Sequence, residues 1–144
     1  MRRRAPRHAN PAGLDGMWLF EGCTPKEHKK LRNIGTRVRV PGGRTVCIEG
    51  GHGTDVVVVV EGMASCHVRG ETVANFGPGD FFGEVSALDG GRRTATVVAD
   101  TDMDVLVLGR AEFDHLLLIS PEVARRMLHV AAGRLRQANR LVPA

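Results

Sequence analysis

The sequence predicts a mainly β protein, a sandwich or jelly roll of seven or eight short strands with helices at both ends. Most of the 18 glycines lie between Gly35 and Gly91, where they separate short runs of β-branched residues. Helical periodicity returns only from Arg110 onward. The length of 144 residues and a hydrophobic content of 42% suit one domain with one core.

The N-terminal end divides into a tail and a first helix. Residues 1–16 combine arginine, proline, glycine and alanine without apolar periodicity, so we expect a disordered basic tail and a folded domain over residues 17–144. After an apolar cluster, Thr24 can cap a helix that has Pro25 at its first position. This pattern predicts a short helix over Lys26–Ile34.

The strands are predicted from short apolar or β-branched runs that end at turn residues. Glycine, often with proline, lies between most of them and favours tight turns. The expected strands are Arg37–Val40, Arg44–Ile48, Val56–Glu61, Ala64–Arg69, Glu71–Phe76, Thr94–Ala99 and Met103–Leu108.

Two helices are expected at the C-terminal end. The first covers Ala111–Ile119, and Ser120 followed by Pro121 then starts a second helix that runs to about Arg140. This long helix can pack on the β domain or pair with its twin in a homodimer. Its apolar residues recur at spacings of three and four and form one stripe: Val123, Met127, Ala131, Leu135 and Ala138.

The net charge of +4 is concentrated at the two ends of the chain. Residues 1–16 hold four arginines and one aspartate, and residues 121–144 hold five arginines and one glutamate. Such basic ends can attract nucleic acid or another polyanion, but solvated arginines on a tail and a helix flank explain them as well.

The sequence gives little support for a disulfide framework, a metal site or a membrane-spanning segment. Cys23, Cys47 and Cys66 form no C-x-x-C pair, so we expect neither a disulfide framework nor a thiolate metal site. The six histidines lack metal-ligand spacing. The longest purely apolar run, Val56–Val60, is far too short to span a membrane, and no signal peptide is evident, so we expect a cytoplasmic protein.

The segment Phe82–Val97 carries the most informative chemistry. Gly83 opens a stretch, Glu84–Leu88, that is long enough for about one helical turn before a double glycine ends it. Backbone N–H groups at such a helix start favour an anion, and Arg93 can return to the same point with a guanidinium suited to phosphate. A carboxylate beside a phosphate would repel the ligand unless it accepts from hydroxyls, so Glu84 suggests a sugar and the pair suggests a nucleotide.

The ordered residues Gly83-Glu84, Leu88 and Arg93-Thr94-Ala95-Thr96-Val97 resemble the phosphate-binding cassette of the cyclic-nucleotide-binding domain family. That family includes the catabolite activator protein and the regulatory subunits of cyclic-AMP-dependent protein kinase. The resemblance covers about residues 17–141, with Gly77-Pro78-Gly79-Asp80-Phe81-Phe82 directly before the cassette. It implies an eight-stranded jelly roll, or double-stranded β-helix, with short N-terminal helices and a long C-terminal helix.

The resemblance also implies roles for single residues. Glu84 would accept the ribose 2′-hydroxyl, Arg93 would pair with the exocyclic phosphate oxygens, and Thr94 would contact phosphate or base. Asn139 aligns with a polar residue that reaches the adenine amino group. The backbone amides that complete the phosphate cradle are those of Gly83, Glu84, Val85, Ser86 and Ala87. The ligand expected is cyclic AMP rather than cyclic GMP, with no further cofactor.

Each role has a simpler alternative. Glu84 and Arg93 alone could be an ion pair that ties two loops, Thr94 could be only a strand residue, and Asn139 could be an exposed helix residue. Arg92 is expected to face solvent, because the family pattern assigns the phosphate to Arg93.

No catalytic constellation is evident, so we expect a sensor and not an enzyme. Ligand binding would shift the cassette and the C-terminal helices, and an unknown protein partner would respond. The alternative is a transcription regulator like the catabolite activator protein, truncated or acting with a DNA-binding partner. This chain ends at Ala144, without room for the usual helix-turn-helix domain, so DNA binding by itself is not expected. A degenerate barrel without ligand is a third alternative.

Overall fold

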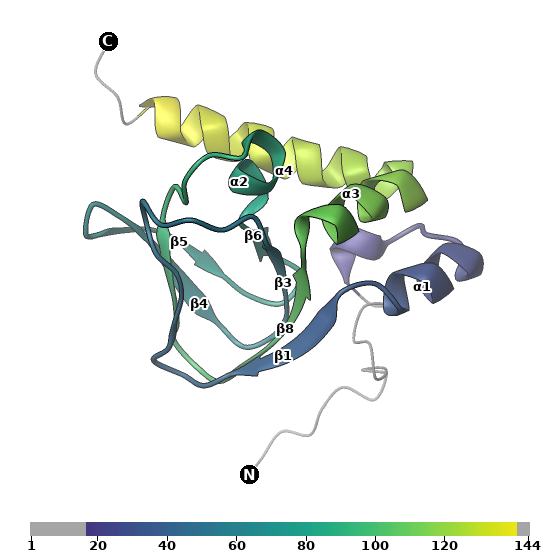
Figure 1. The fold of residues 1–144 in the computed structure, drawn as a ribbon, viewed down its shortest axis with the longest axis horizontal. Helices are drawn as coiled ribbons and strands as arrows, with labels where there is room; N and C mark the ends of the chain where they lie inside the picture. The colour runs from purple at the N-terminus through teal and green to yellow at the C-terminus, as the bar shows by residue number, and fades with distance from the viewer. Residues whose placement is uncertain (1–16, 141–144) are drawn as a thin grey trace.

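In the computed structural model, which describes residues 17–140 and the side chains of residues 17–138, two four-stranded sheets form a β roll. The first and third α-helices lie at one end of the roll, and the last helix runs along one side of it (Figure 1). The strands are β1 (Thr36–Val40), β2 (Thr45–Cys47), β3 (Val56–Glu61), β4 (Ala64–Val68), β5 (Glu71–Phe76), β6 (Phe81–Phe82), β7 (Thr96–Ala99) and β8 (Met103–Leu108). The helices are the 3₁₀ turn η1 (Trp18–Phe20), α1 (Pro25–Arg32), α2 (Glu84–Asp89), α3 (Arg110–Ile119) and α4 (Pro121–Arg140).

The sheets have jelly-roll connectivity, because most neighbours in a sheet are not neighbours in the chain. One sheet has the order β1-β8-β3-β6 and the other β2-β7-β4-β5, and the pairings are antiparallel. Each sheet therefore joins strands from the first and the second half of the roll. The predicted mainly β class with flanking helices is confirmed.

Strand β3 explains the longest apolar run of the sequence. All five residues of Val56–Val60 are buried. Because side chains alternate along a strand, Val56, Val58 and Val60 join the core under the helices, whereas Val57 and Val59 join the core inside the β roll. A strand that separates two cores has no polar face, so its sequence shows no alternation.

The helix starts are those that the capping residues predict. Thr24 and Glu27 form a capping box at α1, in which the Glu27 N–H donates to the Thr24 hydroxyl over 3.1 Å. The Ser120 hydroxyl accepts a hydrogen bond from the Val123 N–H over 3.3 Å at the start of α4.

Several boundaries differ from the prediction. β2 is shorter than Arg44–Ile48, β7 begins at Thr96 and not at Thr94, and the two-residue strand β6 was not predicted. The cause at β7 is the preceding loop: the Arg93 N–H donates to the Gly51 carbonyl over 2.8 Å, which holds this segment on the β2–β3 loop.

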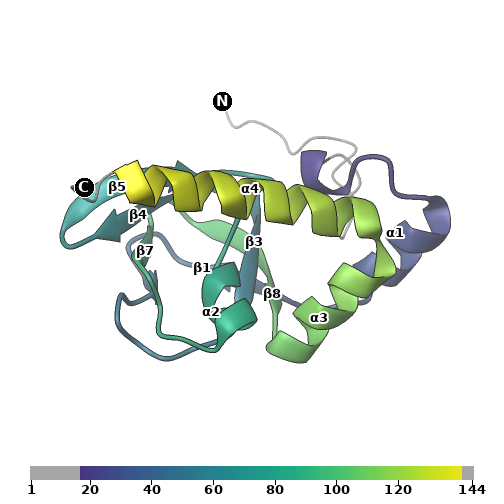
Figure 2. The same cartoon turned by 90° about the horizontal axis from the view of Figure 1, so that it is seen from above.

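The apolar stripe of α4 is only partly buried. Val123 and Met127 lie in the core, but Leu135 is 63% exposed and Ala138 is exposed as well. The first half of α4 packs on η1 and α3, whereas its second half extends over the β roll near α2 (Figure 2). The predicted stripe is therefore a core contact at its start and an open surface at its end.

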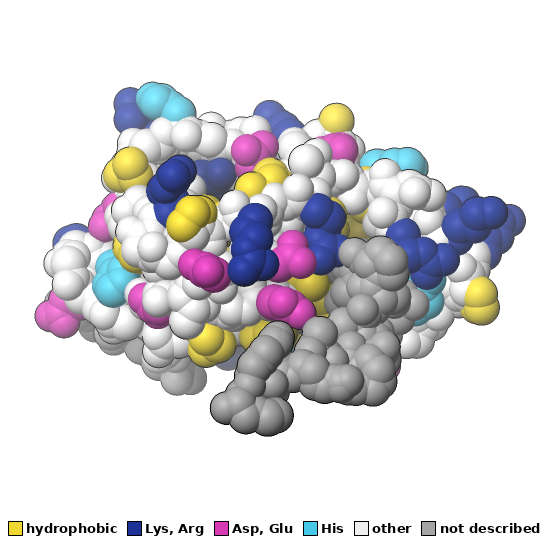
Figure 3. Space-filling model, turned by 90° about the horizontal axis from the view of Figure 1, so that it is seen from below, with side chains coloured by type: hydrophobic (Ala, Val, Ile, Leu, Met, Phe, Trp, Pro, Cys, Tyr) yellow, Lys and Arg dark blue, Asp and Glu magenta, His cyan; other side chains and the backbone are white. Residues whose placement is uncertain are grey.

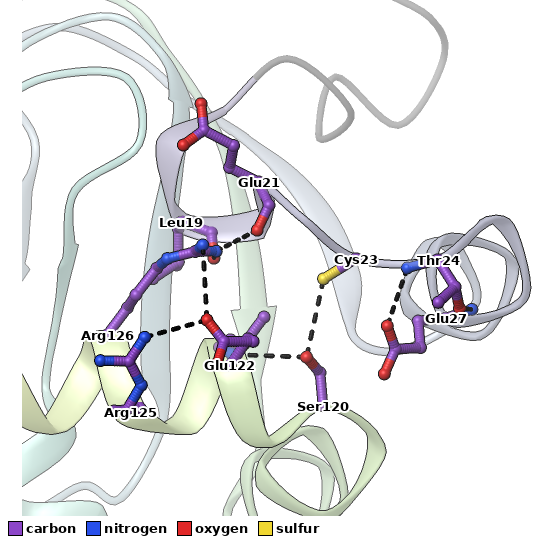
Figure 4. A network of polar contacts seen from close by, with 10 residues as sticks. Leu19, Glu21, Cys23, Thr24, Glu27, Ser120, Glu122, Arg125 and Arg126 are labelled. Carbon is purple, nitrogen blue, oxygen red and sulfur yellow. Dashed lines mark hydrogen bonds and ion pairs between the residues drawn. The ribbon is translucent and has the colours of Figure 1, made fainter.

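Arg126 of α4 fastens the N-terminal segment to this helix (Figure 4). Its guanidinium donates to the carbonyls of Leu19 and Glu21, lies 5.8 Å from the centre of the Trp18 ring and is 3.7 Å from a Glu122 carboxylate oxygen. The position of η1 and the position of α4 are therefore coupled.

Charge is unevenly distributed on the surface. Figure 3 shows one face on which basic and acidic side chains intermingle in the middle, while basic side chains gather at the end where α1 lies. The exposed basic residues of α1 are Lys26, Lys29, Lys30 and Arg32. Within the described residues, no helix is long and apolar enough to cross a membrane.

Candidate functional site

The turn between β6 and α2 requires glycine. Gly83 has a φ of 91°, and a Cβ there would lie 2.5 Å from the Asp55 carbonyl oxygen and 2.9 Å from an Arg93 guanidinium nitrogen. Gly90, with a φ of 72°, ends α2. The predicted short helix bounded by glycines is present, and Gly83 lets the chain approach β3 and Arg93 closely.

Arg93 lies at the start of α2, as predicted. Its backbone is fixed by the β2–β3 loop: the Gly50 N–H donates to the Arg93 carbonyl, and the Arg93 N–H donates to the Gly51 carbonyl, each over 2.8 Å. The guanidinium is half-buried and donates to the Gly83 carbonyl over 3.3 Å. Arg92 is exposed, as expected, and its guanidinium donates to the Gly50 carbonyl.

Glu84 is buried, with 4% of its surface exposed, and its partner was not predicted. Its carboxylate oxygen Oε2 accepts from the Arg134 guanidinium of α4 over 2.9 Å. The same guanidinium donates to the Phe81 carbonyl over 2.5 Å and lies over the rings of Phe76 and Phe81, with centroid distances of 5.2 and 4.7 Å. The ion pair that the structure gives Glu84 is thus with Arg134 and not with Arg93.

The sequence held one signal for Arg134. It follows Met127 by seven residues, so both side chains lie on the same face of α4. A charged residue on the buried face of a helix indicates a buried partner, but its position among five arginines in residues 121–144 hid this signal.

The remaining predicted residues differ in their surroundings. Ser86 and Ala87 are buried, and the Ser86 hydroxyl donates to the Arg92 carbonyl over 3.1 Å, so it closes the cassette turn. Val85 is 40% exposed, and Thr94 is exposed and lies outside any strand. The side chain of Asn139 lies outside the described residues.

Two free cysteines line the interior of the β roll near these arginines. Cys47 of β2 and Cys66 of β4 both pair with Val97 of β7, so the three side chains share the inner face of the sheet. Burial raises the pKa of both thiols, against a smaller lowering by Arg93 at Cys47 and by Arg134 at Cys66. Both thiols are therefore neutral at pH 7.

The space beside the cassette is apolar. A pocket between α2, α3 and α4 is lined by the buried Glu84 and by six apolar residues: Leu88, Phe113, Leu117, Met127, Leu128 and Ala131. Among the described side chains, no cluster of histidine, cysteine or acidic residues is arranged to hold a metal ion. The charged groups at this site are the two arginines and Glu84, an arrangement suited to an anionic ligand that also bears hydroxyls.

Comparison with known proteins gives one family. The model described as the cyclic nucleotide-binding domain matches residues 37–120. A cyclic AMP receptor protein from Thermus thermophilus is 34% identical over 131 residues, which cover 88% of this chain and 61% of the relative. A cAMP-dependent protein kinase regulatory subunit from Neurospora crassa is 31% identical over 121 residues, or 83% of this chain and 31% of that protein.

Solved structures agree with these matches. The crystal structure of the Thermus thermophilus catabolite activator protein superimposes with a TM-score of 0.73 at 34% identity, covering 84% of this chain and 59% of that one. The N-terminal domain of a transcriptional regulator from Streptomyces coelicolor superimposes with a TM-score of 0.66 at 33% identity, covering 92% and 95% of the two chains. The chain thus spans less than two thirds of these two curated relatives but nearly all of that isolated domain.

Proposed function

Because the chain belongs to the cyclic nucleotide-binding domain family, we propose that it is a sensor that binds a cyclic nucleotide at the start of α2 and transmits occupancy through α4. The observation that carries this proposal is the position of the Arg93 guanidinium, which donates to the carbonyl of Gly83, the residue directly before Glu84. Arg93 provides the charge and geometry for the phosphate, and Glu84 accepts the ribose 2′-hydroxyl. The amides of Gly83, Glu84, Val85, Ser86 and Ala87 complete the cradle.

The charges of Glu84, Arg93 and Arg134 are consistent with this assignment. A buried carboxylate beside an anionic ligand is unfavourable unless a cation compensates it. Arg134 supplies that cation and contacts Oε2, which leaves Oε1 outside this ion pair. The site with its ligand phosphate would then hold two positive and two negative charges.

The proposed ligand is cyclic AMP in preference to cyclic GMP, with no additional cofactor. The support is indirect: the curated relatives named above are a cyclic AMP receptor protein and a cAMP-dependent kinase subunit. Asn139 is the proposed contact to the base, and Thr94 the proposed contact to the phosphate or the base. Location in the cytoplasm and the identity of a protein partner stay predictions.

The proposed transmission route is the Glu84–Arg134 ion pair. It links the cassette directly to α4, and the apolar pocket between α2, α3 and α4 leaves space for a small shift of these helices. A ligand hydroxyl that donates to Oε1 would alter this ion pair, and it would shift α4 between two positions by as much as the ligand's affinities for those two positions differ.

Isothermal titration calorimetry with cyclic AMP and cyclic GMP tests the proposal. The chain should bind cyclic AMP more tightly, and Arg93→Ala should weaken binding by about 100-fold or more, because it removes two charge-assisted hydrogen bonds. Arg92→Ala is the matched control, since Arg92 is the adjacent arginine and is exposed, and it should change affinity less than about threefold. If the chain bound neither nucleotide, the result would instead indicate a β roll that has lost the ability to bind a cyclic nucleotide.

A second candidate is the sensor half of a transcription regulator that dimerises through α4. The observations that favour it are the 34% identity to the cyclic AMP receptor protein and the exposure of two leucines on α4, Leu128 at 61% and Leu135 at 63%. Sedimentation velocity should then show a dimer that Leu128→Glu with Leu135→Glu dissociates. A gel-shift titration with duplex DNA at several salt concentrations tests the DNA contribution, and no retardation at low salt would exclude binding by this chain alone.

A further inference from the structure

Gly53, in the loop between β2 and β3, lies directly against the guanidinium of Arg93. A Cβ at this position would be 3.0 Å from Nε, 3.0 Å from Nη2 and 3.3 Å from Cζ of Arg93. Cζ is farther than both nitrogens, so the Gly53 backbone faces the edge of the guanidinium that carries Nε and Nη2. Gly83 contacts the same group from the other side, since its own Cβ would be 2.9 Å from Nη1.

This close contact distinguishes Gly53 from most turn glycines of the chain. Gly43, Gly70 and Gly79 also have positive φ, but a Cβ on any of them would meet no atom within 4 Å. Glycine at those turns satisfies the backbone alone. Gly53 has a φ of 155° and, in addition, a functional side chain in the space where a Cβ would be.

We propose that Gly53 is a positioning residue for phosphate recognition, because the absence of a side chain there lets the Arg93 guanidinium fit between Gly53, at its Nε–Nη2 edge, and Gly83, at Nη1. The inference rests on the proposed function and adds the β2–β3 loop to the anion site. The loop also fixes the Arg93 backbone through Gly50 and Gly51, so it holds both ends of this residue.

The geometry indicates where a substitution would act. The atoms that a Cβ at residue 53 would displace are at the far end of a flexible side chain, so the fold can yield at this contact. The guanidinium would then leave its position by a few tenths of an ångström or more. Bidentate contact with a phosphate depends on that position and on the plane of the fork.

A double-mutant cycle with Gly53→Ala and Arg93→Ala separates this role from a general effect on the loop. Calorimetry or competition with a fluorescent cyclic AMP analogue would measure the affinity of all four chains. Gly53→Ala should weaken binding by about tenfold or more, the amount expected when one charge-assisted hydrogen bond is lost. In the Arg93→Ala background the same change should alter affinity by less than about twofold, because no guanidinium is left to displace.

The matched control for backbone strain is Gly43→Ala, which also places a Cβ at positive φ but in open space. Equal losses from Gly53→Ala in both backgrounds, or no loss in the unmodified chain, would overturn the inference. A chain that binds neither cyclic nucleotide before any substitution would overturn the proposed function instead, and this inference with it.

The cycle remains informative if Gly53→Ala alone folds poorly. Removing the guanidinium should restore part of the melting temperature, so that Gly53→Ala with Arg93→Ala is more stable than Gly53→Ala. If both chains are equally destabilised, the effect of residue 53 is on the loop backbone and the positioning role is wrong.

Discussion

Replacing Arg134 with alanine should destabilise the fold before any ligand is considered. The substitution removes the hydrogen bond to Glu84 Oε2, the hydrogen bond to the Phe81 carbonyl and the contacts with two aromatic rings. It also leaves a carboxylate that is 4% exposed without its cation. Fully buried pairs lose roughly 3–5 kcal/mol when one partner is removed.

That upper value needs a reduction, because the Arg134 side chain is 31% exposed and water can reach part of the site. To allow for this exposure we count only one charge-assisted hydrogen bond and one cation–π contact, which gives a loss of about 2–3 kcal/mol in the free energy of unfolding. For a chain of this length the melting temperature should fall by about 6–10 °C.

Thermal and urea unfolding followed by circular dichroism would measure the loss. Arg136→Ala is the control, because Arg136 is an exposed arginine on the same helix and should cost less than about 0.5 kcal/mol. Adding Glu84→Gln to Arg134→Ala should recover part of the stability, since the buried charge is then gone. If Arg134→Ala is no more destabilising than Arg136→Ala, the ion pair does not contribute to the fold and the proposed transmission route loses its basis.

Three further outcomes are expected. The free energy of unfolding from urea titrations should be lower for Gly62→Ala than for Gly43→Ala by about 2 kcal/mol or more. The reason is that a Cβ at Gly62 would lie 2.4 Å from a backbone carbonyl oxygen, whereas a Cβ at Gly43 would meet no atom within 4 Å. Equal free energies of unfolding would contradict this prediction. Arg126→Ala should shift the emission of Trp18, the single tryptophan of the chain, since it removes the guanidinium 5.8 Å from the ring, and an unchanged spectrum would refute the contact. Alkylation of Cys47 should be slow at pH 7 and should accelerate only above the pH range in which ordinary thiols ionise, because burial raises the pKa of the Cys47 thiol. Mass spectrometry of the labelled peptide measures the rate, and a fast reaction at neutral pH would contradict the prediction.

Much of the fold was predictable from local signals. Thr24 with Pro25 and Ser120 with Pro121 predict two helix starts from adjacent residues, and both are confirmed. β6 was missed because two residues are too few for a periodic pattern, and this strand depends on its pairing with β3. The start of β7 was misplaced because hydrogen bonds from a distant loop decide it.

The candidate site was likewise predictable only where its residues lie close together in the sequence. Gly83 and Arg93 lie within one short segment, so their spacing alone predicted that the Arg93 side chain returns to the start of α2. Arg134 and Gly53 lie far from this segment in sequence, and no local pattern shows what their positions contact. Only the folded chain shows that Arg134 is the partner of Glu84 and that Gly53 lies against the edge of the Arg93 guanidinium.

The family match ends at Ser120, one residue before α4 begins. A fragment cut at that boundary would keep the whole cassette but lose the guanidinium that neutralises Glu84. Such a fragment would leave the buried Glu84 carboxylate without its cation, which is unfavourable where water is largely excluded. A fragment that keeps the Glu84–Arg134 ion pair is therefore longer than the segment that the family model matches, and it must extend at least to Arg134.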